Sequence, residues 1–80
     1  MNNPVQVLVT GATGRTGSLV VQKLQQRKEQ FIVRGFARSR QKVEQLFGTT
    51  EGFYFGDIRD PASLAPALVG CQGIVLQLPI

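Results

Sequence analysis

Eighty residues are enough for one small domain with a thin core, so we expect a single unit over residues 1–80. Hydrophobic residues make up 42% of the chain and charged residues 18%, which is typical of a globular rather than a disordered protein. One cysteine, Cys71, and no histidine exclude a disulfide framework and a zinc finger, and they indicate a reducing, cytoplasmic compartment with no metal site. No apolar run approaches the roughly 20 residues of a membrane span. The net charge of +4 is scattered along the chain, so neither a membrane nor nucleic acid is the expected partner.

The first half of the chain alternates between strand and helix patterns. Residues 5–9 (VQVLV) form a short apolar run rich in β-branched side chains, as in a strand buried on both faces of a parallel sheet. Residues 15–27 place apolar side chains at helical spacing opposite a polar face, which predicts an amphipathic helix. Residues 31–37 (FIVRGFA) predict a second strand, in which Arg34 is a polar member that can reach an edge.

The second half repeats the alternation. Ser39 is a good N-cap for a helix that Gly48 ends, and residues 53–55 predict a third short strand. Asp60 and Pro61 are suited to begin a third helix, in which Pro66 is expected to cost a hydrogen bond or to split the helix. Residues 73–78 (GIVLQL) predict a fourth strand.

This order, β-α-β-α-β-α-β, predicts an α/β fold: the first half of a doubly wound, Rossmann-like parallel sheet with strands in the order 3-2-1-4. The carboxyl end of the first strand then lies beside the point where the winding reverses, which is where such sheets bind ligands. The fourth strand is expected to leave an uncovered apolar edge and so to favour self-association.

Three glycines follow the first strand at even spacing. Gly11, Gly14 and Gly17 read G-x-x-G-x-x-G, one residue longer than the dinucleotide fingerprint, between a strand and a helix as that motif requires. We expect a turn at the first glycine, an approach of the pyrophosphate at the second and close helix packing at the third. A P-loop is excluded because no Gly-Lys-Ser/Thr triplet is present; a purely structural turn remains the alternative. Further hydrogen-bonding side chains are expected from Thr13, Arg15 and Thr16.

The end of the second strand indicates which dinucleotide is bound. An acidic residue there would bind the ribose 2′-hydroxyl of NAD, but residues 36–42 (FARSRQK) contain no carboxylate. The guanidinium of Arg38 suits a 2′-phosphate, because its planar fork can bind two oxygens. We therefore expect NADP rather than NAD, with a solvated basic helix start as the alternative.

Asp57 and Ile58 follow the third strand, where the adenine of a bound cofactor would lie. The carboxylate of Asp57 can accept a hydrogen bond from the adenine amino group, and Ile58 can pack on the ring. A turn-forming Asp57 and a core Ile58 explain these residues equally well.

Together these segments resemble the atypical, extended-type short-chain dehydrogenase/reductase superfamily, within its NAD(P)-binding group of NmrA-like and biliverdin reductase B-like proteins. The resemblance rests on VTGATGRTG, VRGFARS, GDI followed by DPASLAPAL, and the last strand. It implies that Arg38 and Lys42 hold the 2′-phosphate, with Arg40 a weaker candidate, and that Asp57 and Ile58 contact adenine. It also implies that backbone at Leu78 and Pro79 lines the cofactor, and that the glycine loop holds the pyrophosphate through Gly11, Thr13, Gly14, Arg15, Thr16 and Gly17.

The resemblance implies the cofactor-binding part of an oxidoreductase, present as the N-terminal portion of a longer protein. Where family members carry a catalytic Tyr-x-x-x-Lys pair, this chain has one tyrosine, Tyr54, followed four residues later by Ile58, so no catalytic residue is expected within it. Two alternatives remain at this point. One is a non-catalytic, NADP-responsive regulatory or assembly factor of the NmrA-like type, and the other is a small module that binds a protein partner.

Overall fold

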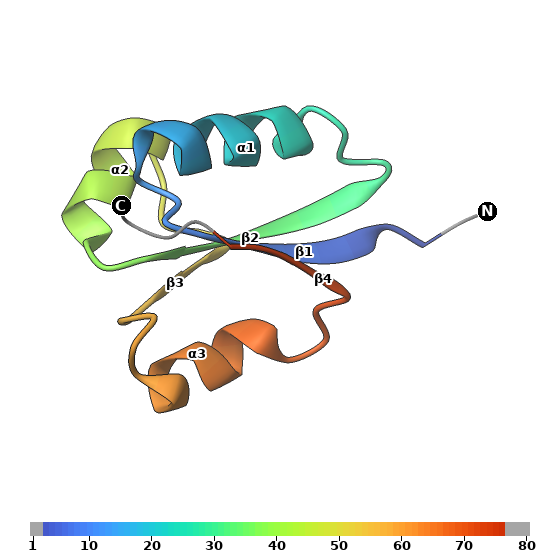
Figure 1. The fold of residues 1–80 in the computed structure, drawn as a ribbon. Coiled ribbons are helices and arrows are strands. Elements are labelled where there is room, and N and C mark those ends of the chain that lie inside the picture. Colours follow the sequence, from blue (N-terminus) through green and yellow to red (C-terminus); the bar gives the residue numbers. More distant parts are fainter. Residues whose placement is uncertain (1–2, 77–80) are drawn as a thin grey trace.

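The structure, a computed structural model, describes residues 3–76. Strands and helices alternate in it as the sequence predicts (Figure 1). The elements are β1 (Val5–Thr10), α1 (Arg15–Gln25), β2 (Phe31–Ala37), α2 (Arg40–Phe47), β3 (Phe53–Phe55), α3 (Pro61–Leu68) and β4 (Gly73–Val75).

The four strands form one parallel sheet in the order β3-β2-β1-β4, which confirms the predicted topology. The register of β1 on β2 runs from Val5 opposite Phe31 to Thr10 opposite Phe36. Helices α1 and α2 cover one face of the sheet and α3 covers the other (Figure 1). All the strands therefore end at the same edge of the sheet, and each helix begins near that edge.

Strand β1 is buried on both faces, because its side chains alternate between two clusters. Val7 and Val9 pack with Val21 of α1, while Leu8 packs with Phe36 and with Ala67 of α3. A strand sandwiched in this way has to be apolar at every central position, and this explains why VQVLV shows no alternation over its last three residues.

The predicted helix boundaries are largely confirmed. The Ser39 hydroxyl accepts a hydrogen bond from the Lys42 N–H at the start of α2, and Gly48 ends that helix in the left-handed conformation, with φ 75°. The Asp60 carboxylate caps α3 by accepting from the Ala62 N–H. Pro66 lies inside α3 without splitting it, since the helix continues to Leu68.

Two elements are shorter than predicted. Helix α1 ends at Gln25, two residues early, because the chain turns there toward β2 through hydrogen bonds from the N–H groups of Gln30 and Phe31 to the Arg27 carbonyl. Strand β4 ends at Val75, so Leu76 follows the strand; positions 77 and 78 of the prediction lie outside the described residues.

Arg34 reaches across the α3 face of the sheet. Its guanidinium donates to the Ala67 carbonyl at 3.0 Å, to the Val69 carbonyl and to Gln6 Oε1, and it lies 5.8 Å from the centre of the Tyr54 ring. Carbonyl groups at a helix C-terminus lack partners within the helix and carry partial negative charge, so a cation stabilises them. Arg34 thus fixes the end of α3 to strands β1 and β2.

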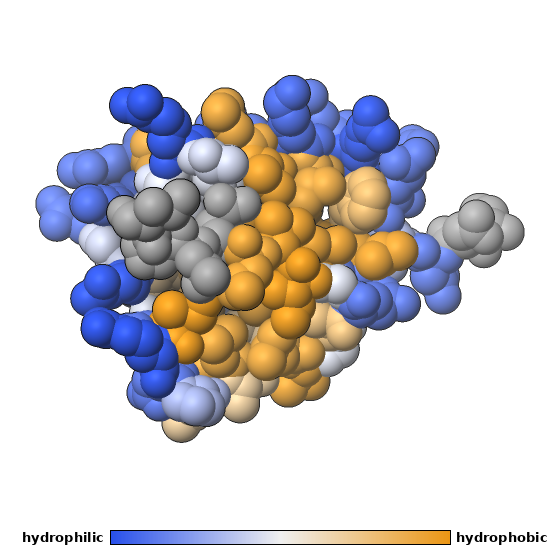
Figure 2. Space-filling model, in the orientation of Figure 1, coloured by the Kyte–Doolittle hydropathy of each residue, from blue (hydrophilic) through white to orange (hydrophobic). Residues whose placement is uncertain are grey.

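Strand β4 forms one edge of the sheet and is poorly covered. Ile74 and Leu76 are 55% and 57% exposed, and Figure 2 shows hydrophobic side chains gathered over the face that β4 presents to the viewer. None of the helices in residues 3–76 is long and apolar enough to cross a membrane.

Replacing Arg34 tests its role at the end of α3. We expect Arg34→Met to lower the free energy of unfolding by about 1.5–3 kcal/mol, because hydrogen bonds from a charged donor are lost while the side-chain volume is kept. Chemical denaturation measures the change. Arg27→Met, at an exposed arginine, is the control, and an equal effect of both substitutions would contradict the account.

Candidate functional site

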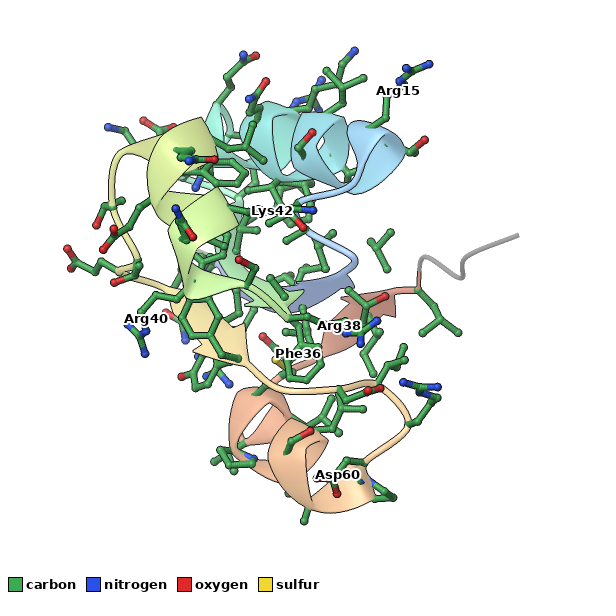
Figure 3. The ribbon with its side chains drawn as sticks, turned by 90° about the vertical axis from the view of Figure 1, so that its left-hand side faces the viewer. Arg15, Phe36, Arg38, Arg40, Lys42 and Asp60 are labelled. Atoms are coloured by element: carbon green, nitrogen blue, oxygen red, sulfur yellow. The ribbon has the colours of Figure 1, made fainter. Side chains whose placement is uncertain are left out.

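An open pocket of about 890 Å³ lies at the edge of the sheet where the strands end (Figure 3). Its volume is within the usual range for small-molecule sites, about 300–1,000 Å³. Three connections build it: the loop from β1 into α1, the end of β2 with the start of α2, and the loop from β3 to α3. The lining residues are Gly11, Thr13, Gly14, Arg15, Thr16, Gly17, Phe36, Ala37, Arg38, Ser39, Lys42, Asp57, Ile58 and Arg59.

The three glycines have different physical roles. Gly11 turns the chain out of β1 with φ 61°, a conformation that side chains other than glycine rarely adopt. At Gly17 an added Cβ would lie 2.0 Å from the Gly11 carbonyl oxygen, so α1 can pack on the loop only without a side chain there. Gly14 has an ordinary φ of −73°, and its added Cβ would meet the same oxygen at 3.2 Å. The predicted turn at Gly11 and the predicted close packing at Gly17 are confirmed.

The start of α1 differs from the starts of the other two helices in the described residues. Side chains of Ser39 and Asp60 cap α2 and α3, whereas the N-cap residue of α1 is Gly14, which has no side chain to cap the helix. The first N–H groups of a helix have no partner within the helix and carry partial positive charge. This uncapped helix start lines the pocket, and such a start is a ready site for an anion.

The basic residues around the pocket separate into two groups. Arg38 and Lys42 line the pocket, and both are labelled in Figure 3. Arg40, two residues beyond Arg38, points the other way, and its Cζ lies 4.5 Å from the centre of the Phe55 ring. Arg15 also lines the pocket but points outward from the start of α1. The cluster of cations in the sequence therefore presents mainly Arg38 and Lys42 to a ligand.

Asp57 forms an ion pair with Arg59, a residue that the sequence analysis did not single out. The Asp57 carboxylate accepts hydrogen bonds from Arg59 Nε at 3.1 Å, from Nη2 at 2.8 Å and from the Arg59 backbone N–H at 2.9 Å. The Arg59 guanidinium and this backbone N–H, together with the charge of Arg38, hold the pKa of the Asp57 carboxyl well below its usual range. Asp57 is therefore an anion at neutral pH, and Arg59 balances its charge locally.

Ile58 has the position expected of a core residue and also lies where it could contact a ligand, the two interpretations that the sequence left open. Its side chain packs against the buried cluster of Leu8, Phe36 and Ala67, and the residue also lines the pocket. It is half-buried, so it can support the core and still present an apolar surface to a ligand.

Ten of the eleven residues predicted to contact a cofactor lie in this one pocket, and the eleventh, Leu78, lies outside the described residues, as does Pro79. That these residues bind a cofactor stays a prediction. The sequence analysis missed Phe36, Ala37, Ser39 and Arg59 as lining residues. An arginine two residues after an aspartate in a turn was the available signal for Arg59, since that spacing suits an Asx-type hydrogen bond.

Comparison with known proteins agrees with this geometry. A family model described as NAD(P)H-binding matches residues 11–78, most of the chain. An uncharacterized chloroplastic protein of Arabidopsis thaliana is 51% identical over 73 residues, which are 91% of this chain and 22% of the relative. Sanguinarine reductase of Eschscholzia californica is 43% identical over 70 residues, 88% of this chain and 25% of the relative. The chain thus spans about a quarter or less of the length of these relatives.

Alanine substitutions at two of the glycines test the loop. Gly17→Ala gains about 1 kcal/mol of helix propensity. The clash with the Gly11 carbonyl, which cannot rotate away, costs about 1–3 kcal/mol. We expect the clash to exceed the gain, so that Gly17→Ala lowers the free energy of unfolding by about 1–2 kcal/mol net.

Gly14→Ala is the matched control, because φ at position 14 suits alanine and the new contact at 3.2 Å is much less severe. Its loss is expected to stay below about 1 kcal/mol, the usual scale of an N-cap change. Thermal and denaturant unfolding of both variants measure the difference. A Gly17→Ala variant as stable as Gly14→Ala would contradict the packing argument.

Proposed function

The chain belongs to the NAD(P)H-binding family, and from that premise we propose that its pocket binds NADP(H) by the adenosine and pyrophosphate portion of the cofactor. The observation that carries the proposal is the uncapped start of α1 in a pocket with four cationic side chains and one carboxylate. A dinucleotide phosphate is an anion that needs several donors, and this pocket supplies both N–H groups and guanidinium groups.

The proposed arrangement follows the three connections that build the pocket. The pyrophosphate binds at the start of α1, from Gly14 to Gly17, where Thr13 and Thr16 supply additional donors. Arg15 adds a donor in this proposal only after its side chain turns inward from its outward position. The adenine lies toward the β3–α3 loop, where Ile58 offers an apolar surface. The side chains of Arg38 and Lys42 bind the 2′-phosphate. Leu78, which lies outside the described residues, remains part of the proposal on the resemblance alone.

The preference for NADP over NAD is part of this proposal. Within the described residues, no carboxylate lies at the end of β2, where an acidic side chain would bind the ribose hydroxyls of NAD. Arg38 and Lys42 lie there instead, on the pocket side, whereas the guanidinium of Arg40 lies over the Phe55 ring. A 2′-phosphate can form charge-assisted hydrogen bonds with both cations, whereas a neutral 2′-hydroxyl cannot.

We propose that the protein containing this chain is an oxidoreductase. When bound, the cofactor supplies a hydride to a carbonyl or conjugated substrate, and these residues bind and orient its adenosine end. One relative is named as a reductase, sanguinarine reductase, which supports a redox role over a purely regulatory one. The residues that contact the nicotinamide and the substrate are proposed to come from outside this chain, which forms the first part of a single NAD(P)-binding domain.

The compartment and the partners are proposed on narrower grounds. A single half-buried cysteine fits a reducing compartment, and we retain the predicted cytoplasmic location as a proposal. The Arabidopsis thaliana relative carries the word chloroplastic in its name, which makes a plastid the competing location. Self-association through β4 and the absence of a nucleic-acid partner stay predictions.

Cofactor choice is tested with a pair of arginine variants. We expect Arg38→Ala to weaken NADP binding by about 1.5–3 kcal/mol, the scale of a charged hydrogen-bonded pair, and to leave NAD binding nearly unchanged. Isothermal titration with each dinucleotide measures both. Arg40→Ala, which removes the same charge two residues away but outside the pocket, should change neither by more than about twofold.

The proposal fails in distinguishable ways. Equal losses of NADP and NAD binding in Arg38→Ala would mean that this arginine does not bind the 2′-phosphate. A larger loss in Arg40→Ala than in Arg38→Ala would mean that the phosphate lies on the Phe55 side of α2.

A further inference from the structure

We propose that Arg59 determines specificity for the 2′-phosphate indirectly, by pairing with the carboxylate of Asp57 so that Arg38 remains available to the ligand. The inference rests on the proposed function, because it assigns a role within the same site. It starts from an apparent contradiction: a pocket suited to an anion contains the aspartate Asp57 on its wall. An unpaired carboxylate there would repel the 2′-phosphate and compete with it for Arg38.

The pairing uses both oxygens of the carboxylate. Oδ1 accepts from the Arg59 backbone N–H at 2.9 Å and from Nε at 3.1 Å, while Oδ2 accepts from Nη2 at 2.8 Å. Two parallel hydrogen bonds from one guanidinium fix the relative orientation of the two groups as well as their distance. The backbone hydrogen bond adds a turn that keeps the Arg59 side chain close to Asp57.

The loop that carries Asp57 is held on both sides, so the carboxylate has little freedom to swing away. The Asp57 N–H donates to Ser63 Oγ at 3.1 Å, and the Ser63 hydroxyl donates to the Asp57 carbonyl at 2.9 Å. The Gly56 N–H donates to the Ala37 carbonyl at 3.1 Å, which joins the loop to the end of β2. With its backbone anchored between α3 and β2, Asp57 stays in the pocket, and the partner of its carboxylate decides how much charge it presents.

Arg38 is the second cation that acts on Asp57. Its charge contributes to lowering the pKa of the Asp57 carboxyl, after the larger contributions of Arg59. The two residues line the same pocket, although no ion pair between them is present in the described residues. Removing Arg59 would leave Arg38 as the cation that the carboxylate attracts, and Arg38 would then be partly neutralised before a ligand arrives.

The expected size of the effect is moderate. The Arg59 side chain is 77% exposed and that of Asp57 is 32% exposed, so water and salt screen the pair. Exposed ion pairs are weak, so we expect the pair to change affinity by no more than about fivefold. The pair therefore adjusts the choice between two dinucleotides and contributes little to folding.

A double-mutant cycle separates this role from a direct contact. Arg59→Ala, Asp57→Asn and the double variant are made in the intact protein, and NADP and NAD are titrated against each. We expect Arg59→Ala to weaken NADP binding about three- to fivefold and NAD binding less than about twofold. In the Asp57→Asn background the same arginine change should leave the NADP-to-NAD affinity ratio unaltered, because no carboxylate remains to be neutralised.

Controls keep the outcome specific. Arg59→Lys should keep most of the NADP-to-NAD affinity ratio of the unaltered protein, since lysine keeps a positive charge beside Asp57. Arg27→Ala, which removes one positive charge far from the pocket, should leave this ratio unchanged. The ratio should also become less sensitive to Arg59→Ala at high salt.

The proposal is overturned if Arg59→Ala weakens NADP binding equally in both backgrounds, because Arg59 would then contact the ligand itself. It is also overturned if NADP and NAD binding fall together. Absence of NADP binding by the unaltered protein would overturn the proposed function, and this inference with it.

Discussion

The first turn of α1 packs directly on the loop that leaves β1, because position 17 has no side chain. A single added carbon there would lie 2.0 Å from the Gly11 carbonyl oxygen. This close contact brings the uncapped N–H groups of the helix to the edge where the strands end, beside Arg38 and the β3–α3 loop. With a longer helix–loop distance, the three parts of the pocket would not face the same ligand.

The other two helices show why this arrangement favours an anion at α1. The Ser39 and Asp60 side chains each accept a hydrogen bond from one N–H group at the start of α2 and α3, so fewer N–H groups are available to a ligand at those two helix starts. At α1 the corresponding groups remain available, and the nearby cations Arg38 and Lys42 add charge where α2 begins. Two helix starts are therefore capped by side chains of the chain itself, and the third, at α1, has N–H groups available to bind a phosphate.

Local signals in the sequence were sufficient for the fold. The β-branched run at β1, the Asp60–Pro61 helix start and the Gly48 helix end each act within a few residues, and their predicted positions agree with the structure. The parallel order followed from the right-handed connection between strands. For the site, the same reasoning placed ten candidate residues in one pocket, because residues at the carboxyl ends of neighbouring parallel strands meet at one edge.

The features that could not be predicted from the sequence are side-chain contacts between residues that only the folded structure brings together. Arg34 finds carbonyl partners 33 and 35 residues away, and Arg40 stacks on Phe55, which a separate strand supplies. The pairing of Arg59 with Asp57 is local, yet its meaning depends on Arg38, which lies on another element. The position of Arg38 directly after β2 favoured it over Arg40 in the sequence, but the contact of Arg40 with the Phe55 ring, outside the pocket, could not be predicted from the spacing.

The most direct test of the central claim is an amide NMR titration of the chain with 2′,5′-ADP and, separately, with 5′-AMP. The account predicts that both ligands shift the backbone amides of residues 13–17 at the start of α1, and that only 2′,5′-ADP strongly shifts those of residues 38–42. Undisturbed amides at the start of α1, or equal shifts at residues 38–42 with both ligands, would contradict it.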